Sequence, residues 1–462
     1  MVHFIASGKE AAVQTWRAEN MVSGILGIGY NISKANRTDG RVQNLAAHID
    51  KDTLRAIHRK MVSGKASGID KVTKEEYEAK LDANLDNLLN RMKRGAYRPN
   101  PSRRAYIPKC GSSKMRPLGI SCYEDKLVEN AIAQILIPIY EQKFITTSYG
   151  FRPNRSCHMA VREVIEMVQY RKTNYVVEAD IRGFFDNVDH EWLMKMLTHD
   201  IADKRFLEVI HKFLKAGIME NGKYLDSEKG TPQGNGVSPV LANVYLHYVL
   251  DLWFEKILKC RMRGQCYLIR YADDFICCFQ HKDEAEMFQE VIGKRFAKFG
   301  MELAEEKTKI MEFGRFAEAN RKKRGEGKPE TFDFLGFTFY CGKSNRKGFF
   351  RCRVKTSRKK FISKIKAMKE WIKEHRTMPL KEMFRIISAK LRGHYQYYGV
   401  TDNTKAITRF YVQTEWLIYK WLNRRGQRKS YKRKEFFFGL LKTFKLPEPK
   451  IYVSLFYRQV QI

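Results

Sequence analysis

At 462 residues, with 44% hydrophobic and 13% aromatic residues, the chain is long enough for two or three domains and too apolar to be disordered. Its formal net charge of +35 would cause strong self-repulsion unless a polyanion neutralises it. No stretch approaches the roughly 18 consecutive apolar residues of a membrane span, and the N-terminus lacks a signal peptide, so we expect a soluble intracellular protein without a membrane partner.

The first third of the chain predicts helices and one strand pair. Residues 1–45 are rich in Gly, Asn and Ser, show weak periodicity, and form an N-terminal extension of unknown role. A helix is predicted over residues 74–94, and a strand pair over residues 103–108 and 116–120. Over residues 124–144 apolar positions recur at helical spacing, which predicts a buried helix.

The middle of the chain alternates short strands with helices. The run YVVEADI (residues 175–181) predicts a strand that ends in Asp180, and Asp189 is expected to cap a helix over residues 190–198. Together with the strand pairs that follow, this alternation predicts a small antiparallel sheet backed by helices.

A long helix and two more strand pairs come next. Ser238 is predicted as the N-cap of a helix over residues 239–258, because Pro239 suits the first helical position. The segment YLIRYADDFICCF (residues 267–279) predicts a hairpin of two apolar strands. Residues 332–340 predict a further strand pair.

Asp273 and Asp274 stand side by side at the tip of the predicted hairpin. Partial burial would raise the cost of ionising both carboxylates, and a hard divalent cation such as Mg²⁺ would resolve it, because Mg²⁺ accepts a few carboxylate oxygens and keeps positions for water and phosphate. A solvated Asp-Asp turn is the alternative. Asp180 ends another apolar run and could lie beside the hairpin, and three acids at one sheet edge would form a two-metal site for nucleotidyl transfer.

The last quarter of the chain predicts a basic helical surface. In residues 361–374 one apolar helix face is predicted, formed by Phe361, Ile362, Ile365, Met368 and Ile372. Residues 341–462 contain 32 Lys and Arg and 7 Asp and Glu, so they carry +25 of the +35 charge, and many aromatic residues lie among them. A solvated basic face over an aromatic core would not explain the sign of the charge. Nucleic acid is therefore the predicted partner, since phosphates reward dense Lys and Arg by counterion release.

An ordered set of motifs resembles the reverse transcriptases of bacterial group II introns. The motifs are KCGSSKMRPLGI (109–120), SYGFRPNR (148–155), ADIRGFFD (179–186), GTPQGNGVSPVL (230–241), YADD (271–274) and FLGF (334–337). The resemblance covers about residues 50–425. It implies an α+β fold, namely a right-hand polymerase with fingers, an RRM-like antiparallel-sheet palm and an α-helical thumb, also called domain X. The implied activity is an RNA-directed DNA polymerase of the bacterial cytoplasm, which adds dNTPs to a primer 3′-hydroxyl on an RNA template.

The resemblance also divides the chain into domains. After the N-terminal extension it implies fingers (46–170), a catalytic palm (171–345), a thumb (346–425) and a basic C-terminal extension (426–462). No Cys/His endonuclease pattern follows the basic region, so cleavage of a second DNA strand is not expected. Asn235 stands where many relatives carry Gly or Ser, which leaves the geometry of that loop open.

Roles for single residues follow only from the resemblance. Asp180, Asp273 and Asp274 would be the catalytic carboxylates. Together with the Ile181 carbonyl they would bind two Mg²⁺ ions, for which Mn²⁺ could substitute. The chain would thus perform two-metal nucleotidyl transfer.

The resemblance places four residues at the incoming nucleotide. Lys109 and Arg116 would grip the triphosphate, as cations that match phosphate oxygens do. Gln233 would lie near the sugar and base. Phe185 would stack under the deoxyribose and exclude a 2′-hydroxyl, with a plain core phenylalanine as the alternative.

Primer and template contacts are implied for Phe334, Leu335, Gly336 and Arg152. For the first three, a core strand explains the residues almost as well. The basic C-terminal region resembles a domain that helps group II intron RNA to splice, so maturase activity and binding of that RNA are expected. Three alternatives stay open: a host-adopted enzyme in DNA repair or phage defence, a non-catalytic RNA-binding splicing factor, and an RNA-templated RNA polymerase.

Overall fold

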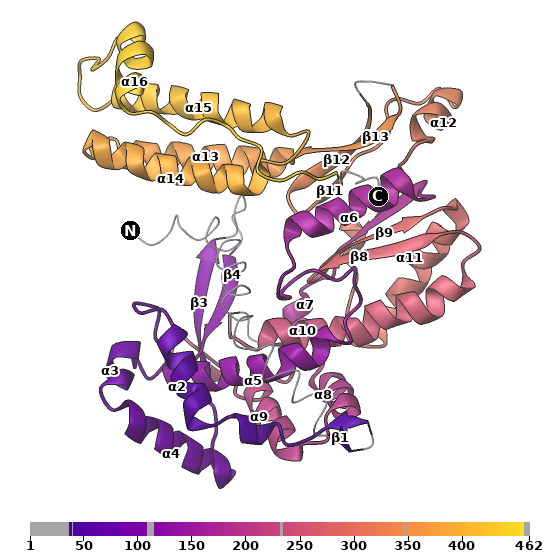
Figure 1. The fold of residues 1–462 in the computed structure, drawn as a ribbon, viewed down its shortest axis with the longest axis vertical. Helices are drawn as coiled ribbons and strands as arrows, with labels where there is room; N and C mark the ends of the chain where they lie inside the picture. The colour runs from indigo at the N-terminus through magenta and orange to yellow at the C-terminus, as the bar shows by residue number, and fades with distance from the viewer. Residues whose placement is uncertain (1–36, 39, 109–114, 232–233, 345–347, 457–462) are drawn as a thin grey trace, which may run out of the picture.

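The computed structural model describes residues 37–38, 40–108, 115–231, 234–344 and 348–456. Three parts of the predicted chain lie outside these ranges: most of the N-terminal extension, Lys109 with the connection between the first predicted strand pair, and Gln233. Figure 1 shows the C-terminal helices across the top of the molecule, a two-stranded hairpin below them, and a sheet with its helices to one side.

The palm sheet has four antiparallel strands in the order β10-β5-β9-β8. The strands are β5 (Tyr175–Ala179), β8 (Cys266–Tyr271), β9 (Asp274–Phe279) and β10 (Lys309–Glu312). Successive side chains of a strand point to opposite faces. In β9, Phe275 and Cys277 enter one hydrophobic core together with α11 (Lys282–Ala297), whereas Ile276 and Cys278 enter a second core together with α6 (Cys157–Tyr170). The sheet is therefore buried on both faces, and its chemistry is confined to its edges and strand ends.

The fingers contain a second sheet, in the order β4-β3-β6-β7. Its strands are β3 (Ser102–Pro108), β4 (Met115–Ile120), β6 (Ile218–Glu220) and β7 (Lys223–Leu225). Helices surround its base: α2 (Lys51–Lys60), α3 (Lys74–Glu78), α4 (Leu81–Lys93), α5 (Tyr123–Glu141), α8 (His190–Asp200) and α9 (Lys204–Leu214). A short strand pair, β1 (Arg37–Thr38) and β2 (Arg41–Val42), packs against α8.

The single helix predicted over residues 74–94 is wrong, because the chain forms α3 and α4 with a break between them. Thr73 and Glu76 form a reciprocal capping box at the start of α3. Lys80 leaves the helical region at φ −131° and ψ 38°, and the Asn84 side-chain amide donates a hydrogen bond to the Tyr77 carbonyl at 3.0 Å. The amide of Asn84 thus satisfies one carbonyl at the end of α3.

The predicted cap of the long helix also needs correction. Ser238 is the first residue of α10 (Ser238–Leu246), and the Asn235 side chain accepts a hydrogen bond from the Ser238 N–H at 2.9 Å. Asn235 therefore satisfies a free N–H of the helix start. Beyond α10 the helix continues as two π-helical segments, His247–Asp251 and Phe254–Leu258.

The thumb consists of three helices, α13 (Arg358–Glu374), α14 (Leu380–Tyr398) and α15 (Thr404–Leu422). A three-stranded sheet joins it to the palm, in the order β11 (Phe332–Phe334), β12 (Phe337–Lys343) and β13 (Phe350–Thr356). Strand β13 was missed because helices were expected after residue 350. On α13 the side chain of Ile362 is 54% exposed, so its predicted place on the buried face is wrong, and Trp371 is buried instead.

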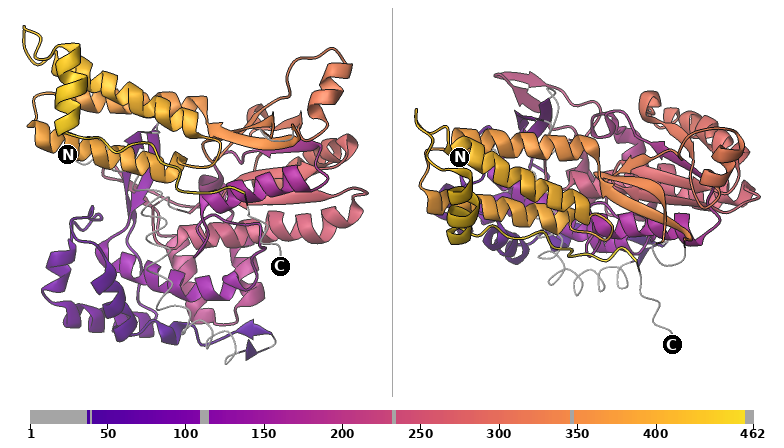
Figure 2. Two further views of the ribbon diagram at one scale, coloured as in Figure 1. Left: turned by 45° about the horizontal axis from the view of Figure 1, so that its top comes forward. Right: turned by 90° about the horizontal axis from the view of Figure 1, so that it is seen from above.

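Smaller elements complete the described chain: α7 (Phe184–Asn187), α12 (Ala317–Lys323), a π-helical segment at Glu435–Leu440, α16 (Leu441–Thr443), and short 3-10 turns at Ala46–His48, Lys259–Arg261 and Glu305–Lys307. After α16 the chain returns along the thumb to α6 (Figure 2). There Val453 pairs with Val400, and the Arg162 guanidinium donates to the Ser454 carbonyl at 2.7 Å. The C-terminal extension thus ties the thumb to the palm.

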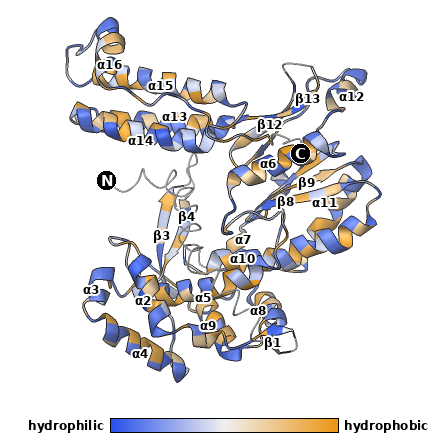
Figure 3. Cartoon of the chain, in the orientation of Figure 1, coloured by the Kyte–Doolittle hydropathy of each residue, from blue (hydrophilic) through white to orange (hydrophobic). Residues whose placement is uncertain are grey.

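Hydrophilic and hydrophobic residues alternate along α13, α14 and α15, as expected for amphipathic helices (Figure 3). None of the helices in the described ranges is long and apolar enough to cross a membrane. The predicted domain boundaries stay a prediction, and some elements cross them. Helix α6 packs on the palm sheet, and β6 joins the fingers sheet although it follows α9 in the chain.

Candidate active site

The three predicted catalytic aspartates lie at one edge of the palm sheet. In the antiparallel pairing of β5 with β9, Ala179 lies opposite Phe275. Asp180 is the next residue, so the same register places it opposite Asp274. The β8–β9 hairpin closes with Tyr271 opposite Asp274. Because Cα atoms of directly paired residues are about 4.5 to 5.5 Å apart, the structure brings Asp180 next to the turn that carries the other two acids.

The backbone after Asp180 is oriented by a single β-bridge. Ile181 and Leu303 face each other in antiparallel fashion. The hydrogen bonds of this bridge are made by the residues on either side of Ile181. The Arg182 N–H donates to the Glu302 carbonyl, and the Asp180 carbonyl accepts from the Ala304 N–H, each at 2.9 Å. In such a pair the bridged residue's own N–H and C=O point to the opposite side of the strand. The Ile181 carbonyl therefore points toward the β9 side, where the aspartate turn lies.

The electrostatics of the turn link Asp273 to the groups around it. Asp273 is half-buried, and burial raises the pKa of its carboxyl. The charge of Asp180 raises this pKa further, whereas Arg116 and Arg270 lower it. Asp274 is exposed at the start of β9. Asp180, from one strand, and Arg116, from the fingers, both act on Asp273.

The residues at this edge fit a divalent cation that is shared with a substrate. Within the described ranges no group of three His, Cys, Asp or Glu side chains, the three aspartates included, is arranged so that it could hold a metal ion by itself. Mg²⁺ does not need one, because it is bound through one or two carboxylates together with substrate phosphates and water. Asp180 and Asp273 repel each other, and the Ile181 carbonyl adds a neutral oxygen on the same side. A cation between them would relieve this repulsion.

The predicted nucleotide-binding residues are described only in part. Arg116 is exposed on β4 and makes no ion pair with a described residue. Lys109 and Gln233 lie outside the described residues. Next to Gln233, Gly234 has φ +115°, and a Cβ there would stand 3.0 Å from the Gly119 carbonyl oxygen. The loop therefore approaches β4 so closely that only glycine fits.

Phe185 is held by contacts on its ring and on its backbone. Its half-buried ring meets the Phe151 ring edge-on at 6.4 Å and the Phe184 ring at 5.3 Å. The Thr231 N–H donates to the Phe185 carbonyl at 2.7 Å, and a Cβ on Gly230 would stand 3.0 Å from the same oxygen. Residues of the GTPQ motif thus fix the backbone of Phe185.

The predicted primer contacts form the turn between β11 and β12. Leu335 and Gly336 have φ values of +49° and +79°, and a positive φ at both central residues is typical of a type I′ hairpin. The Tyr397 hydroxyl donates to the Leu335 carbonyl at 2.9 Å, and the Ser357 N–H donates to the Gly336 carbonyl at 3.0 Å. Phe334 is buried in the core under the turn. The thumb thus holds this turn through Tyr397, a residue for which no role was predicted.

The prediction that Arg152 contacts primer or template is wrong. Its side chain is 4% exposed and forms a bidentate ion pair with Glu141, at 2.8 and 2.9 Å. The remaining terminal nitrogen donates to the Ile145 and Ser148 carbonyls at 2.7 and 2.8 Å. Since these bonds occupy the guanidinium, Arg152 fixes the loop before α6 and has no surface for nucleic acid.

Known proteins resemble this chain in sequence. Residues 107–339 match the family described as Reverse transcriptase (RNA-dependent DNA polymerase). The chain is 30% identical over 450 residues to the Group II intron-encoded protein LtrA of Lactococcus lactis subsp. cremoris. This match covers 80% of this chain and 72% of LtrA. It is 38% identical over 199 residues to Protein YkfC of Escherichia coli, which covers 42% of this chain and 52% of YkfC.

Among solved structures, a telomerase from Candida albicans in complex with a fragment of telomeric RNA is similar with a TM-score of 0.41 at 12% identity. The similarity covers 76% of this chain and 62% of that chain. The family match is the more informative comparison, because residues 107–339 include the motifs that contain the aspartates.

Sequence reasoning also missed Glu129, a buried acid that joins the fingers to the loop before α10. Its carboxylate accepts hydrogen bonds from the Ser121 hydroxyl at 2.5 Å and from the Gly236 N–H at 2.9 Å. Burial raises the pKa of Glu129 to about 7, the Asp125 charge adds to the increase, and Lys126 opposes it. An acid within an apolar helical run was the signal that could have revealed it.

We expect Glu129→Gln to make stability less dependent on pH. The folded-state pKa of about 7 exceeds the ordinary value of 4.5, so the stability that protonated Glu129 provides is fully present below about pH 4.5 and is lost as the pH rises through 7. The loss is on the order of 3 kcal/mol. Glutamine stays neutral, so the variant should lose less free energy of unfolding between about pH 5 and pH 8 in urea titrations. The control is Glu191→Gln, at an exposed residue of α8. A wild-type profile as flat as that of Glu129→Gln would contradict the assignment.

Proposed function

The chain belongs to the reverse transcriptase (RNA-dependent DNA polymerase) family, and from this premise we propose that it extends a primer with dNTPs on an RNA template at the aspartate edge of the palm sheet. The observation that carries the proposal is the β5–β9 register, which pairs Ala179 with Phe275 and so brings the next residue, Asp180, to the aspartate turn. Asp180 and Asp273 would hold the divalent cations with the Ile181 carbonyl. We propose two Mg²⁺ ions, with Mn²⁺ as a substitute.

The residues of the chain bind and orient the reactants. When bound, Mg²⁺ would activate the primer 3′-hydroxyl and neutralise the leaving pyrophosphate. The charge of Arg116, on β4 of the fingers, acts on Asp273, and Arg116 would bind the triphosphate together with Lys109. The turn at Leu335 would hold the primer end, and Gln233 would lie at the nucleotide sugar. Since the protein forms no covalent bond to the substrate in such a reaction, alignment of these groups would be its main contribution to lowering the activation barrier.

Removing one carboxylate charge should abolish DNA synthesis without loss of RNA binding. We expect Asp273→Asn to slow single-nucleotide incorporation on an RNA template by at least about a hundredfold, the scale for one lost charge-stabilising contact. Primer–template affinity, measured by fluorescence anisotropy, should stay within about twofold. The control is Asp283→Asn. Asp283 lies on α11 and forms an exposed ion pair with Arg263. Full activity in an Asp273→Ala, Asp274→Ala double variant would refute the metal assignment.

Phe185 should determine the choice of sugar. We expect Phe185→Ala to raise the incorporation of ribonucleotides relative to deoxynucleotides by at least about tenfold, because removing the ring opens space for a 2′-hydroxyl. The measurement is kcat/KM for matched rNTP and dNTP pairs. Phe316→Ala, a 55% exposed phenylalanine outside the palm sheet, is the control. If the wild type already uses both sugars equally, the gate is misassigned and an RNA-templated RNA polymerase becomes the better description.

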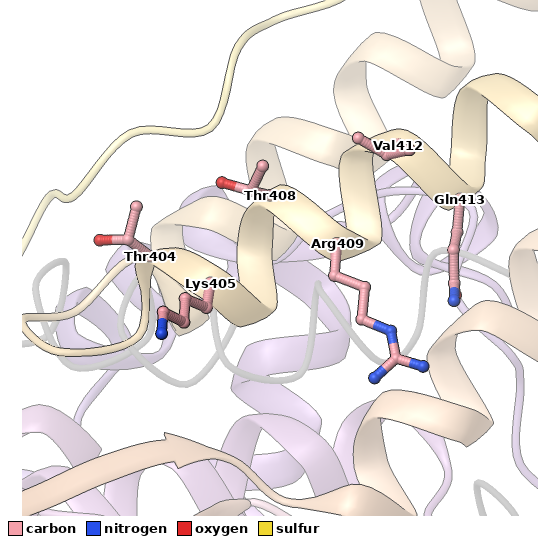
Figure 4. A pocket seen from close by; sticks show the side chains of 6 residues that line it. All are labelled: Thr404, Lys405, Thr408, Arg409, Val412 and Gln413. Carbon is pink, nitrogen blue, oxygen red and sulfur yellow. The ribbon is translucent and has the colours of Figure 1, made fainter.

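We also propose that the thumb and the C-terminal extension bind group II intron RNA and assist its splicing. The support is the +25 charge of residues 341–462 and the exposed face of α15. Figure 4 shows that Lys405, Arg409 and Gln413 project from this face around a shallow hollow. Cations also lie over exposed aromatic rings, as with Arg433 over Trp416 at 4.9 Å. Phosphate contacts and base stacking suit such a surface.

Sequencing the RNA that copurifies with the protein should identify intron RNA, and an unrelated RNA would favour the host-adopted alternative.

Affinity for this RNA should fall steeply with salt because many phosphates are contacted. In Arg428→Ala, Lys429→Ala, both exposed, the slope of log affinity against log salt should fall by about 1 to 2 units. The matched control is Lys282→Ala, Lys294→Ala on α11, where each lysine pairs with a glutamate. A flat salt dependence of the wild type would count against the basic surface.

A further inference from the structure

The turn that carries Asp273 has a backbone conformation that needs support. Ala272 has φ +56°, in the left-handed region that costs a non-glycine residue about 1 to 2 kcal/mol. Its carbonyl belongs to the peptide that leads into Asp273, so the orientation of this peptide sets where the carboxylate stands. Strain of this kind persists only where surrounding contacts hold it.

Arg270 supplies one such contact from below the turn. A terminal nitrogen of its guanidinium donates to the Ala272 carbonyl at 3.0 Å. The side chain is 0% exposed, and the rest of its fork forms a bidentate pair with Asp251 at 2.7 and 2.6 Å. A bidentate arginine–carboxylate pair has a fixed geometry, so the nitrogen that reaches Ala272 is fixed as well. A charge inside the apolar run YLIRY was the sequence signal, and it was overlooked.

Asn243 connects this pair to the other side of the turn. Its carbonyl oxygen accepts from Arg270 at 3.0 Å, while its amide nitrogen donates to the Gly150 carbonyl at 2.7 Å. Gly150 packs directly on the turn, because a Cβ there would stand 2.2 Å from the Ala272 backbone nitrogen. The turn is thus gripped between the Gly150 backbone and the guanidinium of Arg270.

The helix beneath the sheet is shaped to present both partners of Arg270. Asn243 lies in α10 and Asp251 at the end of the first π-helical segment, eight residues later. In a regular α-helix, residues eight apart are about 80° apart around the axis. The π-helical turns contain more residues per turn, which reduces this offset and brings both side chains to one face. Interruptions of this kind occur frequently at functional sites.

Stability alone does not explain a buried arginine–aspartate pair, since replacing such a pair by apolar residues is often neutral or stabilising. We propose that Arg270 and Asn243 are positioning residues, which set the place of the Asp273 carboxylate through the Ala272 peptide and the Gly150 backbone. This inference rests on the proposed polymerase function. It assigns a task in that reaction to residues that touch neither substrate nor metal.

Three variants disturb the grip from different sides. Arg270→Lys keeps the charge but loses the fork, Asn243→Ala keeps the ion pair but loses the tie to Gly150, and Gly150→Ala pushes on the turn. In each we expect single-turnover incorporation on an RNA template to fall about a hundredfold, the cost of displacing a reacting group by about 1 Å. Mn²⁺ titrations followed by electron paramagnetic resonance should show weaker Mn²⁺ binding, while primer–template affinity stays within about twofold.

The control for mere loss of a guanidinium packed on the same helix is Arg295→Lys, at a half-buried arginine. Arg295 donates to the backbone carbonyls of Tyr248 and Val249 in the same π-helical segment but does not reach the turn. It should destabilise the protein in urea unfolding without slowing incorporation or weakening Mn²⁺ binding. Should Arg270→Lys fail to fold, Asn243→Ala and Gly150→Ala still decide, because both leave the ion pair intact.

The outcomes separate the inference from its premise. If the wild type binds primer–template but does not extend it, the proposed function fails. If the wild type extends the primer and Asn243→Ala and Gly150→Ala do so at the wild-type rate with unchanged Mn²⁺ binding, the positioning role alone is overturned. The positioning role is also overturned if Arg295→Lys slows incorporation as much as Asn243→Ala and Gly150→Ala do.

Discussion

The pairing of β5 with β9 is the constraint on which the site depends. Because the two strands run antiparallel in a fixed register, residues almost a hundred positions apart, Asp180 and Asp274, end opposite each other. A slip of one residue would turn every side chain of β5 to the other face, and both faces are buried in hydrophobic cores. The packing of Val176 and Val177 into opposite cores therefore fixes the position of Asp180. The register that stabilises the sheet also brings like charges together at its edge.

The supports of this edge come from all parts of the chain. The fingers bring Arg116 within electrostatic reach of Asp273, and the loop at Gly150 packs on the aspartate turn. On the thumb side, Tyr397 holds the turn at Leu335, and the C-terminal extension returns to α6. Apart from the electrostatic effect of Arg116, each of these connections is a hydrogen bond or a close backbone approach. A change in thumb position would thus reach the Leu335 turn directly, through Tyr397.

The sequence predicted local elements well where the signal is local. Apolar alternation and turn residues predicted β3, β4, β5 and the aspartate hairpin, and Asp189 caps α8 as expected because a cap needs only the next three residues. The α+β fold class is confirmed. Errors arose where a distant partner decides the outcome. Ile362 fits an apolar face by spacing, but it is 54% exposed because no residue in the described part of the chain covers it. Arg152 was assigned to nucleic acid because Glu141 could not be recognised as its partner from sequence.

The distribution of charge follows a related logic. A cation beside the aspartates would compete with a metal ion for their negative charge. Arg270, which acts on Asp273 from inside the palm, has its own charge balanced by the bidentate pair with Asp251. His247, 3.9 Å from Asp251, has its pKa lowered to about 4 by burial and adds no second charge. Arg270 therefore supports the aspartate turn without adding an unbalanced positive charge next to Asp273.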